Sequence, residues 1–251
     1  MNDYLERVVA QVKQALKASA AKHSASVTGK HSLAAVERQI SPLIKESLNE
    51  TLVFLDFETS GLKPEDGCRT TEVGAVKVVN GRVTETFTSL MNPGVWLSRN
   101  IIEINKITNE MVRNAPSPAD VMMQLHEFLD GAPIVAHNAN FDERFLRSEF
   151  ARVELAVPSI VLCSMKLARR VAPGLPSYSL SALSDYFNLQ SNTNAHRALP
   201  DARQTAALWQ ALEESLLEQS GLPRISVRLM NKLQGIPVIN VSSFLRNWCE
   251  D

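Results

Sequence analysis

A short, strongly apolar run at residues 51–57, Thr-Leu-Val-Phe-Leu-Asp-Phe, interrupts an otherwise mixed sequence. Its length and its β-branched and aromatic residues are typical of a central strand that is buried on both faces. Two further β-rich segments follow at 71–79 and 82–90, and Asn80-Gly81 joins them. Because Asn-Gly between two such segments is a strong signal for a tight hairpin turn, the sequence predicts that the core opens with three antiparallel strands.

Helical and strand patterns alternate after this hairpin. Ser98 and Ser117 are each suited to cap the start of a helix. The apolar spacing predicts helices at about 117–129, 140–153, 164–171, 179–187 and 200–217, and short strands at 133–136 and 159–163. This order predicts an α/β fold in which a mixed sheet of five strands is flanked by helices.

The chain divides into a core at residues 49–220 and two extensions. Leucines and valines recur at helical spacing between residues 5 and 16, which predicts a helical N-terminal extension over residues 1–48. Four lysines and no acids occur between residues 13 and 30, a pattern that fits a solvated helical face or a weak nucleic-acid contact. In the C-terminal extension, 221–251, the run 236–241 is typical of a strand that packs on the core or on a partner.

The bulk composition limits how this chain could bind other molecules. Hydrophobic residues make up 45% of it and charged residues 21%, which is ordinary for a folded globular protein. The formal net charge is −1, whereas proteins that hold a long duplex by charge alone are usually basic. Any binding of nucleic acid would therefore depend on a local site.

The cysteines and the N-terminal residues bear on location. The three cysteines include no C-x-x-C pair, which favours reduced thiols in a cytoplasmic protein. The first twenty residues have no apolar signal-peptide segment, and no apolar run reaches membrane-spanning length. We therefore expect a cytoplasmic protein that has no membrane partner.

Two carboxylates stand near the end of the predicted central strand. Asp56 and Glu58 are two residues apart, so they project from the same face of a strand. Unpaired, they would repel each other and raise each other's pKa, and Mg²⁺ or Mn²⁺ would relieve that repulsion through hard oxygen ligands. The D-x-E pattern alone does not establish a metal site, since solvated acids at strand ends produce it often.

Two later motifs add a histidine and an aspartate each. In His137-Asn-Ala-Asn-Phe-Asp142, the aspartate falls in the first turn of a helix, where the macrodipole favours it, and His137 is better read as a satisfied core histidine. In His196-Arg-Ala-Leu-Pro-Asp201, the histidine falls in a polar loop and the aspartate in the first turn of the last core helix. Each residue, taken alone, also fits an ordinary structural role.

Together and in this order, the three motifs resemble those of the DEDDh, or DnaQ-like, 3′→5′ exonucleases, which include the ε proofreading subunits of bacterial DNA polymerase III. The matching stretches are D-x-E-T-x-G at 56–61, H-N-x-x-F-D at 137–142, and His196 with Asp201. Glu72-Val-Gly74 and the stretch 104–108 also match landmarks of that family. The resemblance covers about residues 51–217.

This resemblance implies a ribonuclease H-like fold and a metal-dependent hydrolase that acts in proofreading or repair. Two Mg²⁺ or Mn²⁺ ions would be held by Asp56, Glu58, Asp142 and Asp201. His196 would be the general base, and its loop would let it approach once substrate is bound. The product would be nucleoside 5′-monophosphates, released from the 3′ end of single-stranded DNA. The substrate contacts implied are Thr59, Gly61, Leu62, Asn138 and Phe141, although Phe141 fits a plain core position equally well.

Several alternatives stay open from the sequence. The motifs read a 3′ end and its phosphate, so an RNA-trimming enzyme of the ribonuclease T or oligoribonuclease type fits as well. A non-catalytic nucleic-acid-binding or assembly module would keep the fold, but the complete set of carboxylates argues against it. No convincing clamp-binding motif is seen, which leaves membership of a polymerase assembly open. The N-terminal helices could bind a DNA polymerase or mediate self-association.

Overall fold

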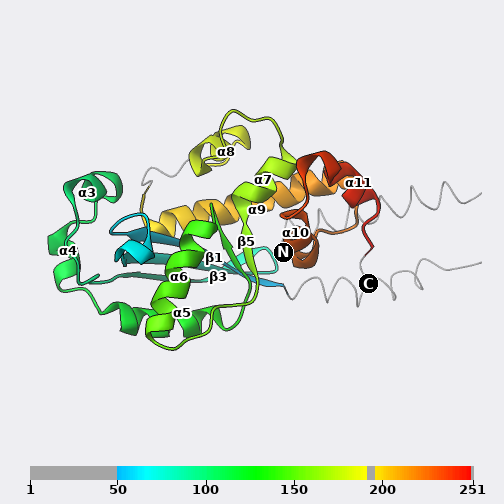
Figure 1. The fold of residues 1–251 in the computed structure, drawn as a ribbon. Coiled ribbons are helices and arrows are strands. Elements are labelled where there is room, and N and C mark those ends of the chain that lie inside the picture. The colour runs from blue at the N-terminus through cyan, green and yellow to red at the C-terminus, as the bar shows by residue number, and fades with distance from the viewer. Residues whose placement is uncertain (1–49, 191–195, 250–251) are drawn as a thin grey trace, which may run out of the picture.

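The computed structural model describes residues 50–190 and 196–249 (Figure 1). Within them a single five-stranded sheet has the order β3-β2-β1-β4-β5. The strands are β1 (Thr51–Thr59), β2 (Thr70–Val79), β3 (Arg82–Leu90), β4 (Ile134–Ala136) and β5 (Val161–Cys163). β1 to β3 are antiparallel, and β4 and β5 run parallel to β1, which confirms the predicted mixed sheet and ribonuclease H-like fold.

The predicted hairpin is present between β2 and β3. Asn80 and Gly81 both have positive φ values, 56° and 71°, as a tight two-residue hairpin turn requires. Asparagine tolerates this conformation better than most residues and glycine adopts it freely. The turn chemistry therefore fixes where β2 ends and β3 begins.

Side-chain alternation along β1 divides the core into two clusters, one on each face of the sheet. Leu52 and Phe54 belong to one cluster, which includes α7 (Ser164–Val171), α8 (Leu180–Tyr186) and α9 (Ala198–Ser220). Val53 and Leu55 belong to the other, which includes α5 (Pro118–Leu129) and α6 (Asn140–Arg152). Residues 56 and 58 continue the first row, so their side chains leave the sheet on the side of α9.

The helix starts follow local capping chemistry. The Ser98 and Ser117 hydroxyls accept hydrogen bonds from Ile101 N and Asp120 N, as their sequence contexts predicted. Ser98 begins α3 (Arg99–Asn105), and Thr108 caps α4 (Asn109–Arg113) in the same way. The stretch 63–67 contains a single 3-10 turn, η1 (Pro64–Asp66).

The C-terminal segment corrects one prediction. Residues 236–241 do not form a strand: they contain a 3-10 turn, η2 (Val238–Asn240), and lead into α11 (Val241–Arg246). Pro237 explains the difference, because it has no N–H for a strand ladder and its carbonyl accepts a turn hydrogen bond from Asn240 N at 2.9 Å. Together with α10 (Val227–Leu233), α11 buries side chains in the core cluster on the α9 side.

The predicted N-terminal extension, residues 1–48, lies outside the described residues, as does the polar stretch 191–194. In the part of the chain that is described, no helix has both the length and the apolar character needed to cross a membrane.

Candidate active site

The carboxylates of β1 face the start of α9. In the sheet register Asp56 lies opposite Gly74 and Glu58 opposite Glu72, so all four positions are on one face of the β1–β2 pair. A Cβ atom at Gly74 would lie 2.1 Å from the backbone nitrogen of Leu199. Only glycine therefore lets the first turn of α9 cross β2 this closely. That close crossing holds the first turn of α9 near the acidic end of β1.

Asp142 approaches the same end of β1 from the other layer of helices. It stands in the first turn of α6 and is almost fully buried. Its Oδ1 atom accepts a hydrogen bond of 3.0 Å from the backbone nitrogen of Phe57, which lies between Asp56 and Glu58. This contact fixes the carboxylate of Asp142 beside the other two.

Burial, together with repulsion between the acids, raises the pKa values of three carboxyl groups in the site. Burial, followed by repulsion from Asp142, Glu58, Asp201 and Glu72, holds the pKa of Asp56 well above its usual range. Burial raises the pKa of Asp142 to about 8, against the opposing effect of the hydrogen bond from Phe57. Burial and repulsion from Asp201 and Glu72 raise the pKa of Glu58 to about 7. Such a cluster of hard oxygen ligands suits a divalent cation, which would offset the repulsion.

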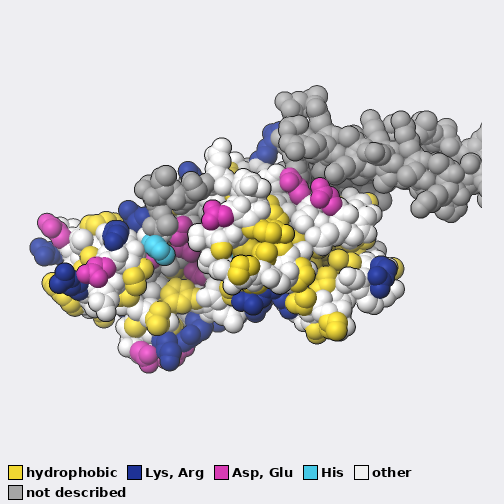
Figure 2. All heavy atoms as spheres, turned by 90° about the horizontal axis from the view of Figure 1, so that it is seen from above, with side chains coloured by type: hydrophobic (Ala, Val, Ile, Leu, Met, Phe, Trp, Pro, Cys, Tyr) yellow, Lys and Arg dark blue, Asp and Glu magenta, His cyan; other side chains and the backbone are white. Residues whose placement is uncertain are grey.

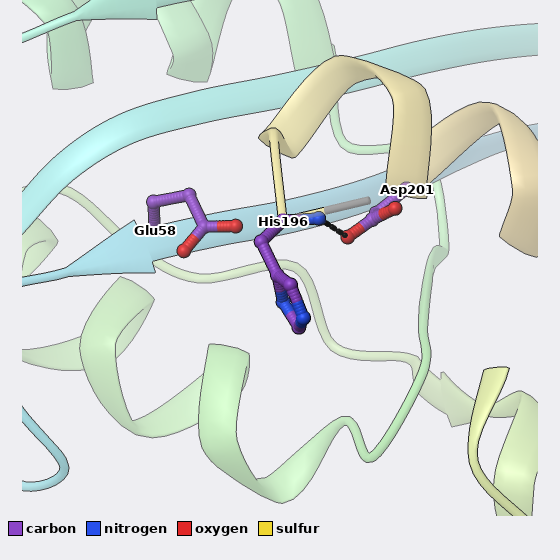
Figure 3. Close-up of side chains that lie close together, drawn as sticks. All are labelled: Glu58, His196 and Asp201. Carbon is purple, nitrogen blue, oxygen red and sulfur yellow. Dashed lines mark hydrogen bonds between the residues drawn. The ribbon is translucent and has the colours of Figure 1, made fainter. Parts of the chain in front are cut away.

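A compact donor set joins β1 to the segment that begins α9. One donor atom each from Glu58, His196 and Asp201 lies within 4.8 Å of the others, and Figure 3 shows the three side chains. The backbone nitrogen of His196 donates a hydrogen bond of 3.1 Å to Asp201 Oδ2, and His196 has a positive φ of 65°. The histidine is exposed, and Figure 2 shows acidic side chains and a histidine together where the surface is hollowed.

His137 is held as a structural residue. Its Nδ1 atom lies 2.9 Å from Ser164 Oγ and its Nε2 atom 3.0 Å from the carbonyl oxygen of Tyr178. Burial lowers its pKa. With both ring nitrogens engaged, His137 links β4 to the segments around α7 and α8, in agreement with the reading of a satisfied core histidine.

The last residue of β1 and the loop that follows it contain three of the predicted substrate contacts. The Thr59 hydroxyl is buried and donates to the carbonyl of Gly61 at 2.6 Å, so it shapes the loop. Gly61 packs so close to Cys68 that a Cβ would lie 2.5 Å from its Sγ. The side chain of Leu62 is 75% exposed and is therefore accessible to a ligand.

The other two predicted contacts flank the start of α6. Asn138 is exposed and has a φ of 60°, and its carbonyl accepts a turn hydrogen bond from Phe141 N at 2.9 Å. Phe141 is half-buried, with its ring centroid 5.0 Å from that of Phe145. The Phe141 ring thus contributes to the core while keeping part of its surface exposed.

Three residues of the site were not predicted. The buried Glu72 binds the guanidinium of Arg197, and the side chain of Asn105 hydrogen-bonds to Glu58 and to the backbone nitrogen of Ile107. Glu72 and Asn105 stand in family landmarks that carried no assigned role. Glu72 could have been found from the strand register, which places it directly opposite Glu58. Asn105 gave no such signal, because its contact depends on how α3 packs.

The stability of the metal-free protein should fall as the pH rises from about 5 to about 8. The folded-state pKa values of Glu58 and Asp142 lie above the ordinary ones, so their contribution is complete at low pH and is lost as the pH passes through about 7 and 8. Thermal unfolding in EDTA and in Mg²⁺ tests this. Burial also raises the pKa of Glu213, on α9, to about 8. Its ionisation should lower stability at high pH both in EDTA and in Mg²⁺, so the difference between the two series reports on the acidic site. A pH dependence unchanged by Mg²⁺ would contradict the account.

Comparisons with known proteins point to one family. A family model described as "Exonuclease" (RNase_T) matches residues 53–209. The chain is 33% identical over 178 residues to DNA polymerase III subunit epsilon of Aquifex aeolicus, covering 70% of this chain and 86% of that protein. It is 32% identical to a PolC-type DNA polymerase III of Caldanaerobacter subterraneus subsp. tengcongensis, covering 80% of this chain but only 15% of the polymerase.

A solved structure extends the likeness to the fold. Exonuclease X in complex with 5′ overhanging duplex DNA has a TM-score of 0.57 and 30% identity, with 73% of this chain and 99% of that chain covered. The residues that the family model matches, 53–209, include the three motifs described above. The chain belongs to the DnaQ-like, or DEDDh, family of exonucleases.

Proposed function

We propose that this protein is a metal-dependent 3′→5′ exonuclease that releases nucleoside 5′-monophosphates from single-stranded DNA. The observation that carries the proposal is the gathering of four carboxylates, Asp56, Glu58, Asp142 and Asp201, from β1, α6 and α9 at one end of the sheet. Folding places at least three of them in surroundings that disfavour a full set of negative charges without a cation. A non-catalytic protein would gain nothing from this arrangement, which destabilises the fold through repulsion between the carboxylates.

These four carboxylates would hold two Mg²⁺ or Mn²⁺ ions. Bound there, such ions supply Lewis-acid stabilisation of the charge that develops on a phosphodiester during hydrolysis. The hard oxygen donors suit both ions. Either metal should therefore support activity.

His196 would take the proton from the attacking water. Its exposed position beside Glu58 and Asp201 supports this role, because an exposed imidazole can meet both a bound strand and solvent. His137 does not compete for the role, since both of its ring nitrogens have partners.

The 3′-terminal nucleotide would lie over the loop after β1 and the start of α6. The exposed Leu62 would pack on a base, and Phe141 would offer the exposed part of its ring. The backbone of Thr59 and Gly61 would line the terminal sugar, and Asn138 would hydrogen-bond the strand. A role in proofreading or repair, in contact with a DNA polymerase, is supported by the epsilon and PolC-type relatives.

The test uses 5′-labelled and 3′-labelled single strands of matched DNA and RNA, with Mg²⁺, Mn²⁺ or EDTA. We expect stepwise shortening of the 5′-labelled DNA and release of labelled mononucleotide from the 3′-labelled strand with either metal. Chelation should abolish both, because the carboxylates would lose the ions that they hold. Faster shortening of RNA would change the assigned substrate, and no shortening of any strand would remove the proposed function.

A further inference from the structure

A fifth acid, Glu72, stands within the carboxylate cluster. Residue 72 lies directly opposite Glu58 in the β1–β2 register and two positions from Gly74, so it shares their face of the sheet. Only 4% of its surface is exposed. Position alone would suggest another metal ligand.

Hydrogen bonds show that the Glu72 carboxylate is already occupied. Oε1 accepts from Arg197 Nη2 at 2.5 Å and from Nε at 3.2 Å. Oε2 accepts from Arg197 Nε at 3.0 Å and from the backbone nitrogen of Ala198 at 3.0 Å. A forked contact of this kind is directional as well as strong, and it leaves little capacity on Glu72 for a cation.

The same contact replaces a missing cap at the start of α9. Arg197 occupies the N-cap position, and its side chain makes no capping hydrogen bond. The carboxylate that receives the first helical N–H, that of Ala198, comes instead from Glu72 on the neighbouring strand. A negative charge at this end also interacts favourably with the helix dipole.

Arg197 directly follows His196. His196 itself is exposed and has the positive φ of 65°, which is uncommon for a residue other than glycine. The next residue, Arg197, is held by the buried carboxylate of Glu72. The carboxylate of Asp201, five residues after His196, accepts a hydrogen bond from the His196 N–H. These two contacts thus limit the backbone conformation at His196 and the direction in which its side chain points.

From these contacts we infer that Glu72 is a positioning residue, which holds Arg197 and thereby aims His196 at the metal-binding carboxylates. The inference rests on the proposed exonuclease function. It assigns Glu72 no contact with substrate or metal. Its effect should therefore appear in the rate of the chemical step rather than in the binding of metal.

The test compares Glu72→Gln with wild type at saturating strand and metal. We expect kcat to fall by roughly 10- to 100-fold, because small displacements of catalytic groups have effects of this size. KM and the half-saturating Mg²⁺ concentration should change by less than about threefold, since the groups that bind the strand and the metal are unchanged. Arg197→Lys, which keeps the charge but loses the fork, should give a smaller loss of kcat and serves as the second variant if Glu72→Gln folds poorly.

Glu149→Gln is the matched control. Glu149 is also buried and receives a fork from an arginine, Arg69, at 2.7 and 2.8 Å, and its other hydrogen bonds come from Thr70 rather than from the segment 196–198. Glu149→Gln should lower the melting temperature and leave kcat within about threefold of wild type, as expected of a stabilising pair away from the reacting groups.

The outcomes separate the inference from the proposed function. An active wild type whose kcat is unchanged in Glu72→Gln would overturn the positioning role and leave the function standing. A rise of more than about tenfold in the half-saturating Mg²⁺ concentration would also overturn the inference, because Glu72 would then act through the binding of metal. A wild-type protein inactive on every strand would overturn the function, and with it the role that rests on it.

Discussion

Asparagine in place of Asp56 is expected to lower the rate of strand shortening by roughly 10³-fold or more, because several kcal/mol of charge stabilisation depend on the metals that this carboxylate would hold. The same change should leave the metal-free fold as stable as wild type or more stable. Burial and four neighbouring acids already raise the pKa of Asp56, and the neutral amide removes that repulsion.

The measurement is the initial rate on a 5′-labelled DNA strand, with thermal unfolding in EDTA alongside it. Asp66→Asn is the control, because Asp66 is an exposed acid on η1, and its rate should match wild type. If Asp56→Asn kept full activity, the acidic cluster would not be the active site. A loss of activity that is explained by unfolding of the variant would also contradict the prediction, because the variant should be at least as stable as wild type.

Alanine in place of Gly74 is expected to damage both stability and activity. The new Cβ would lie 2.1 Å from Leu199 N and 2.2 Å from the carbonyl carbon of Ala198, both of them backbone atoms that cannot rotate away. α9 must therefore move away from β2. We expect this to lower the free energy of unfolding by about 3 kcal/mol or more, which is at or beyond the upper end of the usual range for overpacking. Because the shifted turn includes Asp201, the protein that remains folded should also lose activity, by about 100-fold.

Chemical denaturation and the rate per folded molecule together measure this effect. Gly235→Ala is the matched control: a Cβ there would meet only the Lys232 carbonyl oxygen at 3.5 Å, and its free energy of unfolding should change by less than about 0.5 kcal/mol. A Gly74→Ala protein as stable and active as wild type would show that the close crossing of α9 over β2 is not required.

The sheet and its helices could be predicted because their signals are local. The apolar run at 51–57, the Asn80-Gly81 turn and the serine caps each depend on a few neighbouring residues, and the structure confirms the elements that they predicted. The prediction for 236–241 was wrong for a related reason. The apolar content of this segment favours a strand, but the chain after Pro237 turns instead of extending.

The site was only partly predictable. Spacing identified Asp56 and Glu58 as neighbours, and ordered motifs pointed to Asp142, His196 and Asp201. The partnership of Glu72 with Arg197 joins residues 125 positions apart, and it follows from the register of β2 and the path of α9 rather than from either local sequence. The hydrogen bond between Asn105 and Glu58 likewise depends on tertiary packing.

The binding of Mn²⁺ by the unmodified protein and by Asp56→Asn, measured by calorimetry in the presence of a nucleoside 5′-monophosphate, tests most directly whether the acidic cluster is a two-metal site. We expect about two ions per wild-type chain and the loss of at least one of them in the variant, since two-metal hydrolases hold their ions through shared carboxylates. Equal binding of Mn²⁺ by the two proteins, or no binding by wild type, would contradict the assignment of Asp56, Glu58, Asp142 and Asp201 as its ligands.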